Sequence, residues 1–265
     1  MTFELAIATM GKTLKQVFEM LETMNVHCDC LIINQCGKDD YYEEYRNSQK
    51  IRIIFTKERG LSKSRNMALK NGQADILGIA DDDLCYYDGF EQIILNYYTN
   101  NPNIDIVLFN IDDYYKNFSS RSHICNFFEL SGYISMQCTL RLQSIRTNNL
   151  QFNELFGTGS EYFNSGEENI FLADCWRAKL KIAYCNNKIL RRDECESSWF
   201  TGFNDESFIF TRGAIYYAIS KYFFFLYIIR FAVKYRKRSK PYTIIDTIKL
   251  MLKGRDKYLN ILFDK

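Results

Sequence analysis

The amino-acid sequence predicts an α/β fold with a mainly parallel central sheet flanked by helices. Short apolar runs alternate with amphipathic helical segments over residues 1–110, a pattern typical of parallel strands joined by right-handed crossovers. Apolar residues make up 47% of the 265-residue chain, which is enough for a packed core. Acidic and polar residues directly follow several apolar runs, where the strands of open α/β sheets end and bind ligands.

The elements of this first half follow from apolar runs, helical spacing and the residues that end them. Strands are expected at residues 3–8, 30–33, 51–55, 76–80 and 104–109. Helices are expected at residues 13–24, 61–70 and 90–98. Thr9 ends the first strand and Gly72 ends the second helix. The fourth strand runs directly into three acids, Asp81, Asp82 and Asp83.

Beyond residue 110 the alternation weakens, and residues 111–165 are expected to be mixed strands and loops. Gly166 then opens an amphipathic helix whose first turn carries Glu167 and Glu168. Acids in a first turn are favoured by the helix dipole, so capping alone would explain them. Another strand is expected at residues 182–184.

The C-terminal segment is rich in aromatic and basic residues. Nine aromatic side chains occur between Tyr216 and Tyr235, but Lys221 and Arg230 interrupt the run, so a transmembrane span is not expected. Basic residues and Pro241 follow, and then a second basic amphipathic helix is expected up to residue 263. Such a segment suits the headgroup region of an anionic membrane. Packing on the core or on a second copy of the chain is the alternative.

Composition and missing motifs disfavour several function classes. The net charge of only +2 argues against a nucleic-acid binder. The chain contains neither a G-x-x-x-x-G-K-[ST] loop nor a G-x-G-x-x-G motif after its first strand. His27 and His123 stand in no recognisable triad context. With no signal peptide expected, the nine cysteines are read as reduced cytosolic thiols, and Cys28 and Cys30 match no common zinc pattern.

The most informative segment is residues 58–83. Three adjacent carboxylates repel one another unless a cation lies among them, and hard oxygen ligands suit Mn²⁺ or Mg²⁺. A solvated acidic turn is the simpler alternative, but Arg59 and Arg65 lie just upstream. A metal-diphosphate site with a distant carboxylate pair, Glu167 and Glu168, fits transfer of a group from a nucleotide-activated donor to a hydroxyl.

The order of these motifs resembles the family 2 glycosyltransferases of the GT-A fold. The resemblance rests on Gly60-Leu-Ser-x-Ser-Arg65-Asn66, the aspartate triplet after the next strand, and Gly166-Glu-Glu-x-Ile-Phe171. It is closest to bacterial enzymes that build surface polysaccharides. It implies a GT-A domain at residues 1–205, with a nucleotide-sugar-binding half (1–110) and an acceptor half (111–205). Residues 206–265 would form a helical segment that associates with a membrane or oligomerises.

The resemblance also implies roles for individual acids. Asp81 corresponds to the first acid of a D-x-D motif, which faces the nucleotide. Asp82 is the middle acid, near the donor sugar, and Asp83 is the last, which binds the divalent metal. Glu168 stands where the family places the catalytic base, and Glu167 is the second candidate.

Further donor contacts are expected from Thr9, Arg59 and Arg65. Arg65 corresponds to an arginine on the nucleotide side of the donor, and Arg59 would add a second cation near the diphosphate. The family usually carries Asp-Asp-Gly-Ser after the second strand, with an aspartate that reads uracil. This chain has Asn34-Gln35-Cys36-Gly37 there, so an amide such as that of Gln35 would have to pair with the base edge.

A late histidine ligand of related enzymes is also missing from this chain. Asp193 or Glu194 is expected to supply an oxygen ligand to the metal in its place. Arg192 alternatively stabilises the diphosphate directly, and an exposed charged loop would explain the same residues.

The expected function is an inverting, metal-dependent glycosyltransferase of bacterial surface-polysaccharide synthesis, hexosyltransferase-like in its reaction. The donor would be a nucleotide sugar, UDP-linked, and the acceptor a hydroxyl of a glycan or lipid-linked oligosaccharide. The protein would lie in the cytoplasm at the inner face of the membrane, with a homodimer as one arrangement. One alternative is an inactive homologue that serves as a membrane-bound assembly partner. The other is a sugar nucleotidyltransferase. Such enzymes carry a glycine-rich, basic loop after the first strand, and Ala8-Thr9-Met10-Gly11-Lys12 resembles that loop only weakly.

Overall fold

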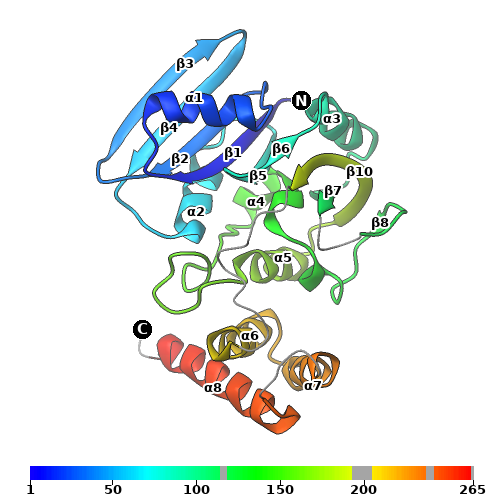
Figure 1. Ribbon diagram of the computed structural model, residues 1–265. Coiled ribbons are helices and arrows are strands. Elements are labelled where there is room, and N and C mark those ends of the chain that lie inside the picture. Colours follow the sequence, from blue (N-terminus) through cyan, green and yellow to red (C-terminus); the bar gives the residue numbers. More distant parts are fainter. Residues whose placement is uncertain (114–117, 193–204, 237–241, 264–265) are drawn as a thin grey trace.

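The chain forms an α/β structure in which helices cover both faces of one twisted sheet (Figure 1). The computed structural model describes residues 1–113, 118–192, 205–236 and 242–263. The strands are β1 (Phe3–Met10), β2 (Cys30–Gln35), β3 (Asp40–Arg46), β4 (Gln49–Thr56), β5 (Ile76–Asp81), β6 (Cys85–Tyr86), β7 (Ile106–Asp113), β8 (His123–Ile124), β9 (Cys138–Arg141) and β10 (Ile182–Arg192).

The strand order is β3-β4-β2-β1-β5-β9-β7-β10-β6, with β8 paired to β10. β4, β2, β1, β5, β7 and β10 run in the same direction, while β9 is inserted antiparallel between β5 and β7. The predicted mainly parallel sheet is therefore confirmed. From β1 the chain moves outward through β2 to β4, and it then returns to β5 on the other side of β1. The strand order therefore reverses between β1 and β5, which opens a crevice at the carboxyl ends of these strands.

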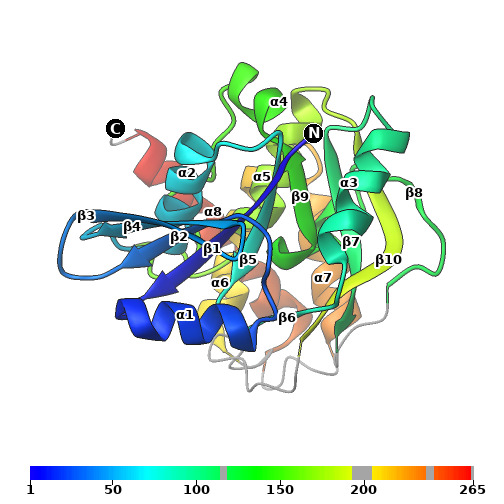
Figure 2. The ribbon, with the colours of Figure 1, turned by 90° about the horizontal axis from the view of Figure 1, so that it is seen from above.

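Helices form a layer on each face of the sheet (Figure 2). α1 (Leu14–Thr23) and α3 (Phe90–Asn100) pack on one face. α2 (Leu61–Asn71), α4 (Leu142–Thr147) and α5 (Glu167–Arg177) pack on the other. The short 3-10 helices η1 (Leu130–Gly132) and η2 (Ser135–Gln137) precede β9. The strands between these layers are apolar on both sides, as in β2, where all six residues are buried.

The C-terminal segment adds three helices beneath α5 (Figure 1). They are α6 (Glu206–Ile219), α7 (Phe224–Tyr235) and α8 (Ile244–Phe263). The aromatic run is thus divided between two helices, because the chain turns at Ser220–Phe223. Ile215 and Ile219 of α6 and Tyr258 of α8 share a hydrophobic cluster with residues of α5, so this segment packs on the rest of the chain.

Two glycines bring α6 and α8 into backbone contact. A Cβ atom on Gly213 would lie 1.9 Å from the carbonyl oxygen of Met251, and one on Gly254 would lie 1.9 Å from that of Phe210. No side chain fits at either position, since real Cβ contacts do not come closer than 3.0 Å. The crossing of these two helices therefore depends on glycine at both sites.

A buried ion pair joins the start of β1 to β4. The Glu4 carboxylate accepts hydrogen bonds from Arg52 Nη2 at 2.5 Å and Nε at 3.1 Å, and both side chains are 4% exposed. The other Glu4 oxygen accepts from the backbone of Gln73. Among the residues that the structure describes, no helix combines the length and apolar character that a membrane crossing requires.

Candidate active site

A cavity of about 630 Å³ opens at the carboxyl edge of the sheet. Its walls come from the ends of β1, β2 and β5, the starts of α2 and α5, and η2. The predicted site residues that line it are Thr9, Gln35, Arg59, Arg65, Asp81, Asp82, Asp83, Glu167, Glu168 and Arg192. Asp193 and Glu194, the expected additional metal ligands, lie outside the described residues. Two cavities of similar volume lie elsewhere, but neither is lined by more than two acids.

The register of the central strands explains why these residues meet. Ala8 of β1 lies beside Asp81 of β5, and Met10 lies beside Gln35 of β2. Because parallel strands end at the same edge, the residues that follow them face one cavity. Asp81 is the last residue of β5, so the acid triplet begins where the strand ends.

The three aspartates have different surroundings. Thr9 donates a hydrogen bond to Asp82 at 2.5 Å, and the Lys12 ammonium lies 3.2 Å from the same carboxylate oxygen. Asp81 lies 3.2 Å from the Arg65 guanidinium. Burial and the negative charge of Asp81 raise the pKa of Asp83, while Arg192 acts in the opposite direction.

Arg65 lies at the centre of the site. Its side chain is 3% exposed, and it donates to Glu167 at 2.6 Å, to Asp81 at 3.2 Å and to the Ser135 hydroxyl at 2.8 Å. These contacts connect α2, α5, β5 and η2. A guanidinium suits this position, because its fixed fork of donors can bind several oxygens at once.

Glu167 and Glu168 begin α5 but differ in role. Glu167 is buried and paired with Arg65, and its carboxylate lies 3.2 Å from where a Cβ on Gly157 would stand. Glu168 is partly exposed and lines the cavity. Burial, and then the neighbouring charge of Glu167, raise the pKa of Glu168 to about 8, although Arg65 opposes the shift. A carboxyl with such a pKa can exchange protons near neutral pH.

The amides that replace the usual acids are engaged within the protein. Asn34 donates to the carbonyl of Lys12 at 2.6 Å and accepts from its N–H at 3.2 Å. Gln35 donates to the carbonyl of Gly60 at 2.8 Å and accepts from its N–H at 3.3 Å. Arg59 donates to the backbone oxygen of Gln35 at 2.9 Å. Asn34 and Gln35 therefore hold the loops that border the cavity.

Two residues of the site received no role from the sequence. Lys12 pairs with Asp82, and Ser135 accepts from Arg65. The Gly11-Lys12 dipeptide after β1 is a weak signal for the first residue. Ser135 lies in a region without periodicity, and no pattern in the sequence singles it out.

Comparisons with known proteins agree with this architecture. The model of Glycosyl transferase family 2 matches residues 6–164, which is more than half of the chain. A solved structure of S. aureus TarS, residues 1–349, superposes with a TM-score of 0.60 at 13% identity, over 98% of this chain and 92% of that one. The same fragment in complex with UDP-GlcNAc gives a TM-score of 0.58 at 14% identity, over 100% and 73% of the two chains. No curated protein matches the sequence.

The mostly parallel sheet, with acids at its carboxyl edge, defines a protein of the GT-A class. The chain belongs to glycosyltransferase family 2. The fold and the family together identify a glycosyltransferase that uses a nucleotide-sugar donor.

Proposed function

We propose that the protein is an inverting, metal-dependent glycosyltransferase that uses a UDP-linked sugar. The observation that carries this proposal is the joint placement of Asp81, Asp83, Arg59 and Glu168 around one cavity. That set offers oxygen ligands for a cation, a guanidinium for a diphosphate and a carboxylate base. The solved TarS complexes with UDP-GlcNAc and UDP support uridine compounds as the first probes.

The residues present fit a divalent metal. Asp83 is exposed and lines the cavity beside the carboxylates of Asp81 and Asp82. Carboxylate oxygens are the ligands that Mn²⁺ and Mg²⁺ prefer. When bound, the metal would neutralise charge on the leaving diphosphate. Asp83 and Asp81 would hold it, while Asp82 stays oriented by Thr9 and Lys12.

Glu168 is the proposed general base. It shares the N-terminus of α5 with Glu167, but only Glu168 is free of the close ion pair with Arg65. In its ionised form it would take the proton from an acceptor hydroxyl. Attack on the side opposite the leaving diphosphate would invert the anomeric carbon. Glu167 is the less suitable base, because protonating it would break its pairing with a buried cation.

Thermal unfolding with Mn²⁺ and a panel of nucleotides and nucleotide sugars tests the donor site. Binding to the native state raises the melting temperature by mass action. A metal-dependent rise with one uridine compound is expected, and Asp83→Ala should abolish it. Asp256→Ala, which removes an exposed aspartate on α8, should leave it unchanged. A shift that survives in Asp83→Ala would contradict the site assignment.

The same protein preparation separates an enzyme from an inactive homologue. Slow hydrolysis of the responsive nucleotide sugar, lost in Glu168→Gln while the thermal shift persists, is expected of the enzyme. Binding without hydrolysis or transfer would favour the assembly-partner alternative. Release of pyrophosphate from a sugar phosphate and UTP would instead indicate a nucleotidyltransferase.

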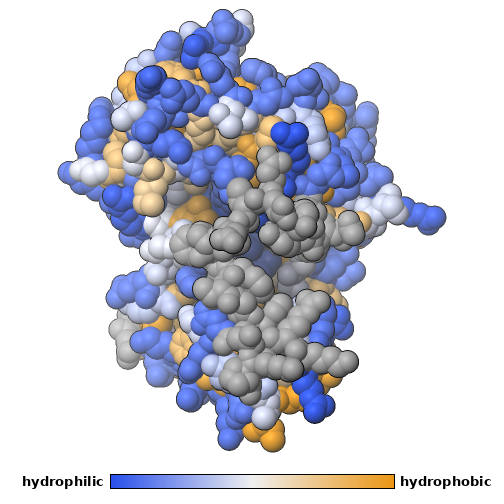
Figure 3. Space-filling model, viewed as in Figure 1, coloured by the Kyte–Doolittle hydropathy of each residue, from blue (hydrophilic) through white to orange (hydrophobic). Residues whose placement is uncertain are grey.

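We further propose that α7 docks this cytoplasmic protein on the inner face of the membrane, where a lipid-linked acceptor would lie. Phe225, Ile229 and Val233 are 58%, 51% and 58% exposed, and they recur every fourth residue, so they form one stripe along the helix. Arg230 and Lys234 flank the stripe. Figure 3 shows apolar residues among hydrophilic ones at the lower end of the molecule, where α7 and α8 lie in Figure 1.

Sedimentation with lipid vesicles tests this docking. The protein should bind vesicles containing phosphatidylglycerol more tightly than neutral ones, because each basic residue near an anionic surface adds about 1 kcal/mol. Phe225→Ser with Ile229→Ser should release it, whereas Tyr45→Ser, at an exposed aromatic on β3, should not. If these serine variants change the oligomeric state and leave vesicle binding intact, the stripe is a homodimer contact.

A further inference from the structure

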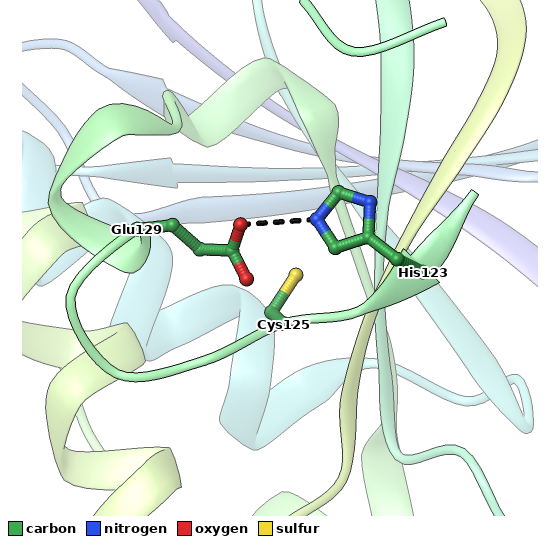
Figure 4. Close-up of side chains that lie close together, drawn as sticks. All are labelled: His123, Cys125 and Glu129. Atoms are coloured by element: carbon green, nitrogen blue, oxygen red, sulfur yellow. Dashed lines mark hydrogen bonds and ion pairs between the residues drawn. The ribbon is translucent and has the colours of Figure 1, made fainter. Parts of the chain in front are cut away.

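A second group of metal-ligating side chains lies outside the catalytic cavity. It consists of His123 on β8, Cys125 directly after β8, and Glu129 at the start of η1 (Figure 4). One imidazole nitrogen, one sulfur and one carboxylate oxygen all lie within 4.8 Å of one another. None of the three residues lines the cavity that holds the aspartate triplet.

The surroundings already orient each ligand. His123 Nδ1 lies 3.0 Å from the carbonyl oxygen of Arg121, and a carbonyl can only accept, so this nitrogen carries a proton. Nε2 then faces Glu129 at 3.0 Å. The other Glu129 oxygen accepts from the backbone N–H of Asn126. Metal-binding histidines commonly donate their second N–H to a carbonyl in this way, which fixes the tautomer and the ring.

The Cys125 sulfur completes the group from the buried side. Its side chain is 2% exposed, whereas His123 and Glu129 are 34% and 27% exposed. The backbone N–H of Cys125 donates to Ile182, and His123 pairs with Tyr184 of β10, so the sheet holds both residues in place. Figure 4 shows the sulfur directed toward the carboxylate. The thiol also donates to the Tyr133 hydroxyl at 4.0 Å, a long contact that a bond to a cation can replace.

We propose that His123, Cys125 and Glu129 bind a zinc ion, with water as the fourth ligand. A mixed set of nitrogen, sulfur and oxygen ligands suits Zn²⁺, while thiolate disfavours Mg²⁺ and Mn²⁺. Tetrahedral zinc places its ligand atoms roughly 3.3–3.8 Å apart. The three ligand atoms lie within 4.8 Å of one another, so small side-chain rotations would bring them to the distances that zinc requires. The ion would take the place of the proton between His123 and Glu129, and the thiol proton would be released.

The position of the site indicates a structural role. Glu129 directly precedes η1, and the chain then passes Tyr133 and reaches Ser135, which contacts Arg65 in the catalytic cavity. The carbonyl of Tyr133 also accepts from Asn169, the neighbour of Glu168 on α5. A zinc ion between β8 and η1 would therefore fix the segment that supports one wall of the cavity.

Titration of the metal-stripped protein with Zn²⁺ alone tests the proposal, and Co²⁺ serves as a spectroscopic substitute. One equivalent of Zn²⁺ should bind and raise the melting temperature, and Co²⁺ should give the absorption of a cobalt-thiolate bond. Because no nucleotide is present, the result does not depend on the catalytic proposal. Cys125→Ser should remove the thiolate absorption, and Cys36→Ser, at a partly exposed cysteine elsewhere, should keep it.

His123 and Glu129 are partly exposed, so substituting them leaves the buried Cys125 in place and should not disturb folding. Glu129→Gln and His123→Gln should each weaken Zn²⁺ binding by about 100-fold or more, since even outer contacts of a metal site contribute 10- to 100-fold. Absence of Zn²⁺ binding by the intact protein would overturn the proposal. Unchanged affinity in both variants would overturn it as well, because the metal would then be bound elsewhere.

Discussion

Arg65 shows how one residue can organise the whole site. It is buried and balances Glu167 and Asp81 from two different elements. The family resemblance of the Gly60–Asn66 motif implied that Arg65 lies on the nucleotide side of the donor. Its link to Glu167 spans 102 residues, and nothing local in the sequence encodes such a contact. Residue identity was thus predictable, while the partner of each charge was not.

Replacing Arg65 should lower the free energy of unfolding. Arg65→Met leaves the buried Glu167 carboxylate without its cation, and breaking a buried pair in this way costs about 3–5 kcal/mol. Urea denaturation should show this loss of unfolding free energy. Arg46→Met, at an exposed arginine 3.9 Å from Glu22, should change stability by less than about 0.5 kcal/mol. Similar effects of the two substitutions would show that Arg65 is not a buried link.

The raised pKa of Glu168 predicts how the activity depends on pH. Its pKa is raised to about 8, and a general base acts only when it is ionised. The kcat/KM for sugar transfer or donor hydrolysis should therefore rise with pH up to about 8 and then level off. Mutating an exposed acid, as in Glu161→Gln, should leave this profile unchanged. A profile that is flat through neutral pH would argue against Glu168 as the base.

At the scale of elements, long strands that are buried on both faces were predictable. β1, β2, β4, β5 and β7 form apolar runs that the sequence predicts. β9 (Cys138–Arg141) is mostly buried but has only four residues, and it was not predicted as a separate strand. β3 was missed, since its residues (Asp40–Arg46) are polar or aromatic and mostly exposed on an edge. The turn between α6 and α7 was missed because Ser220–Phe223 contains neither glycine nor proline.

The crossing of α6 and α8 gives the clearest prediction at this scale. Gly213→Ala introduces a methyl group where the Met251 carbonyl lies 1.9 Å away, so the helices must move apart. Overpacking of this kind costs about 1–3 kcal/mol, which thermal or urea unfolding would measure. Gly37→Ala is the matched control, because nothing lies within 4 Å of its Cβ position. Equal stability of both variants would mean that α6 and α8 do not meet as described.

At the scale of the molecule, the C-terminal helices α6 and α8 contribute side chains to a hydrophobic cluster that they share with the rest of the chain. Phe156 and Phe163, which lie within the family-matching residues 6–164, and Ile170 of α5 pack with Ile215 of α6 and Tyr258 of α8. The boundary at residue 205 followed from the extent of the family resemblance, and a resemblance in sequence does not report which side chains share a cluster. Removing residues 206–265 would uncover this cluster.

Calorimetry of the whole chain should therefore show one cooperative unfolding transition. Shared burial couples the two parts, so neither can unfold without exposing apolar surface of the other. Residues 1–205 expressed alone should melt at a lower temperature and bind a hydrophobic dye. Two separated transitions in the intact chain, with the upper one unchanged in the shorter chain, would contradict this coupling.

The glycine crossing has a consequence for how this architecture can evolve. The backbone contact and the buried side chains beside it fix where α8 meets α6, so the attachment depends on the inward faces of the two helices. The outward surfaces of α7 and α8 are therefore free to drift while the attachment itself is inherited unchanged. Substitutions on the outward surfaces of α7 and α8 can then change which surface or acceptor the protein contacts, without changes in the catalytic half.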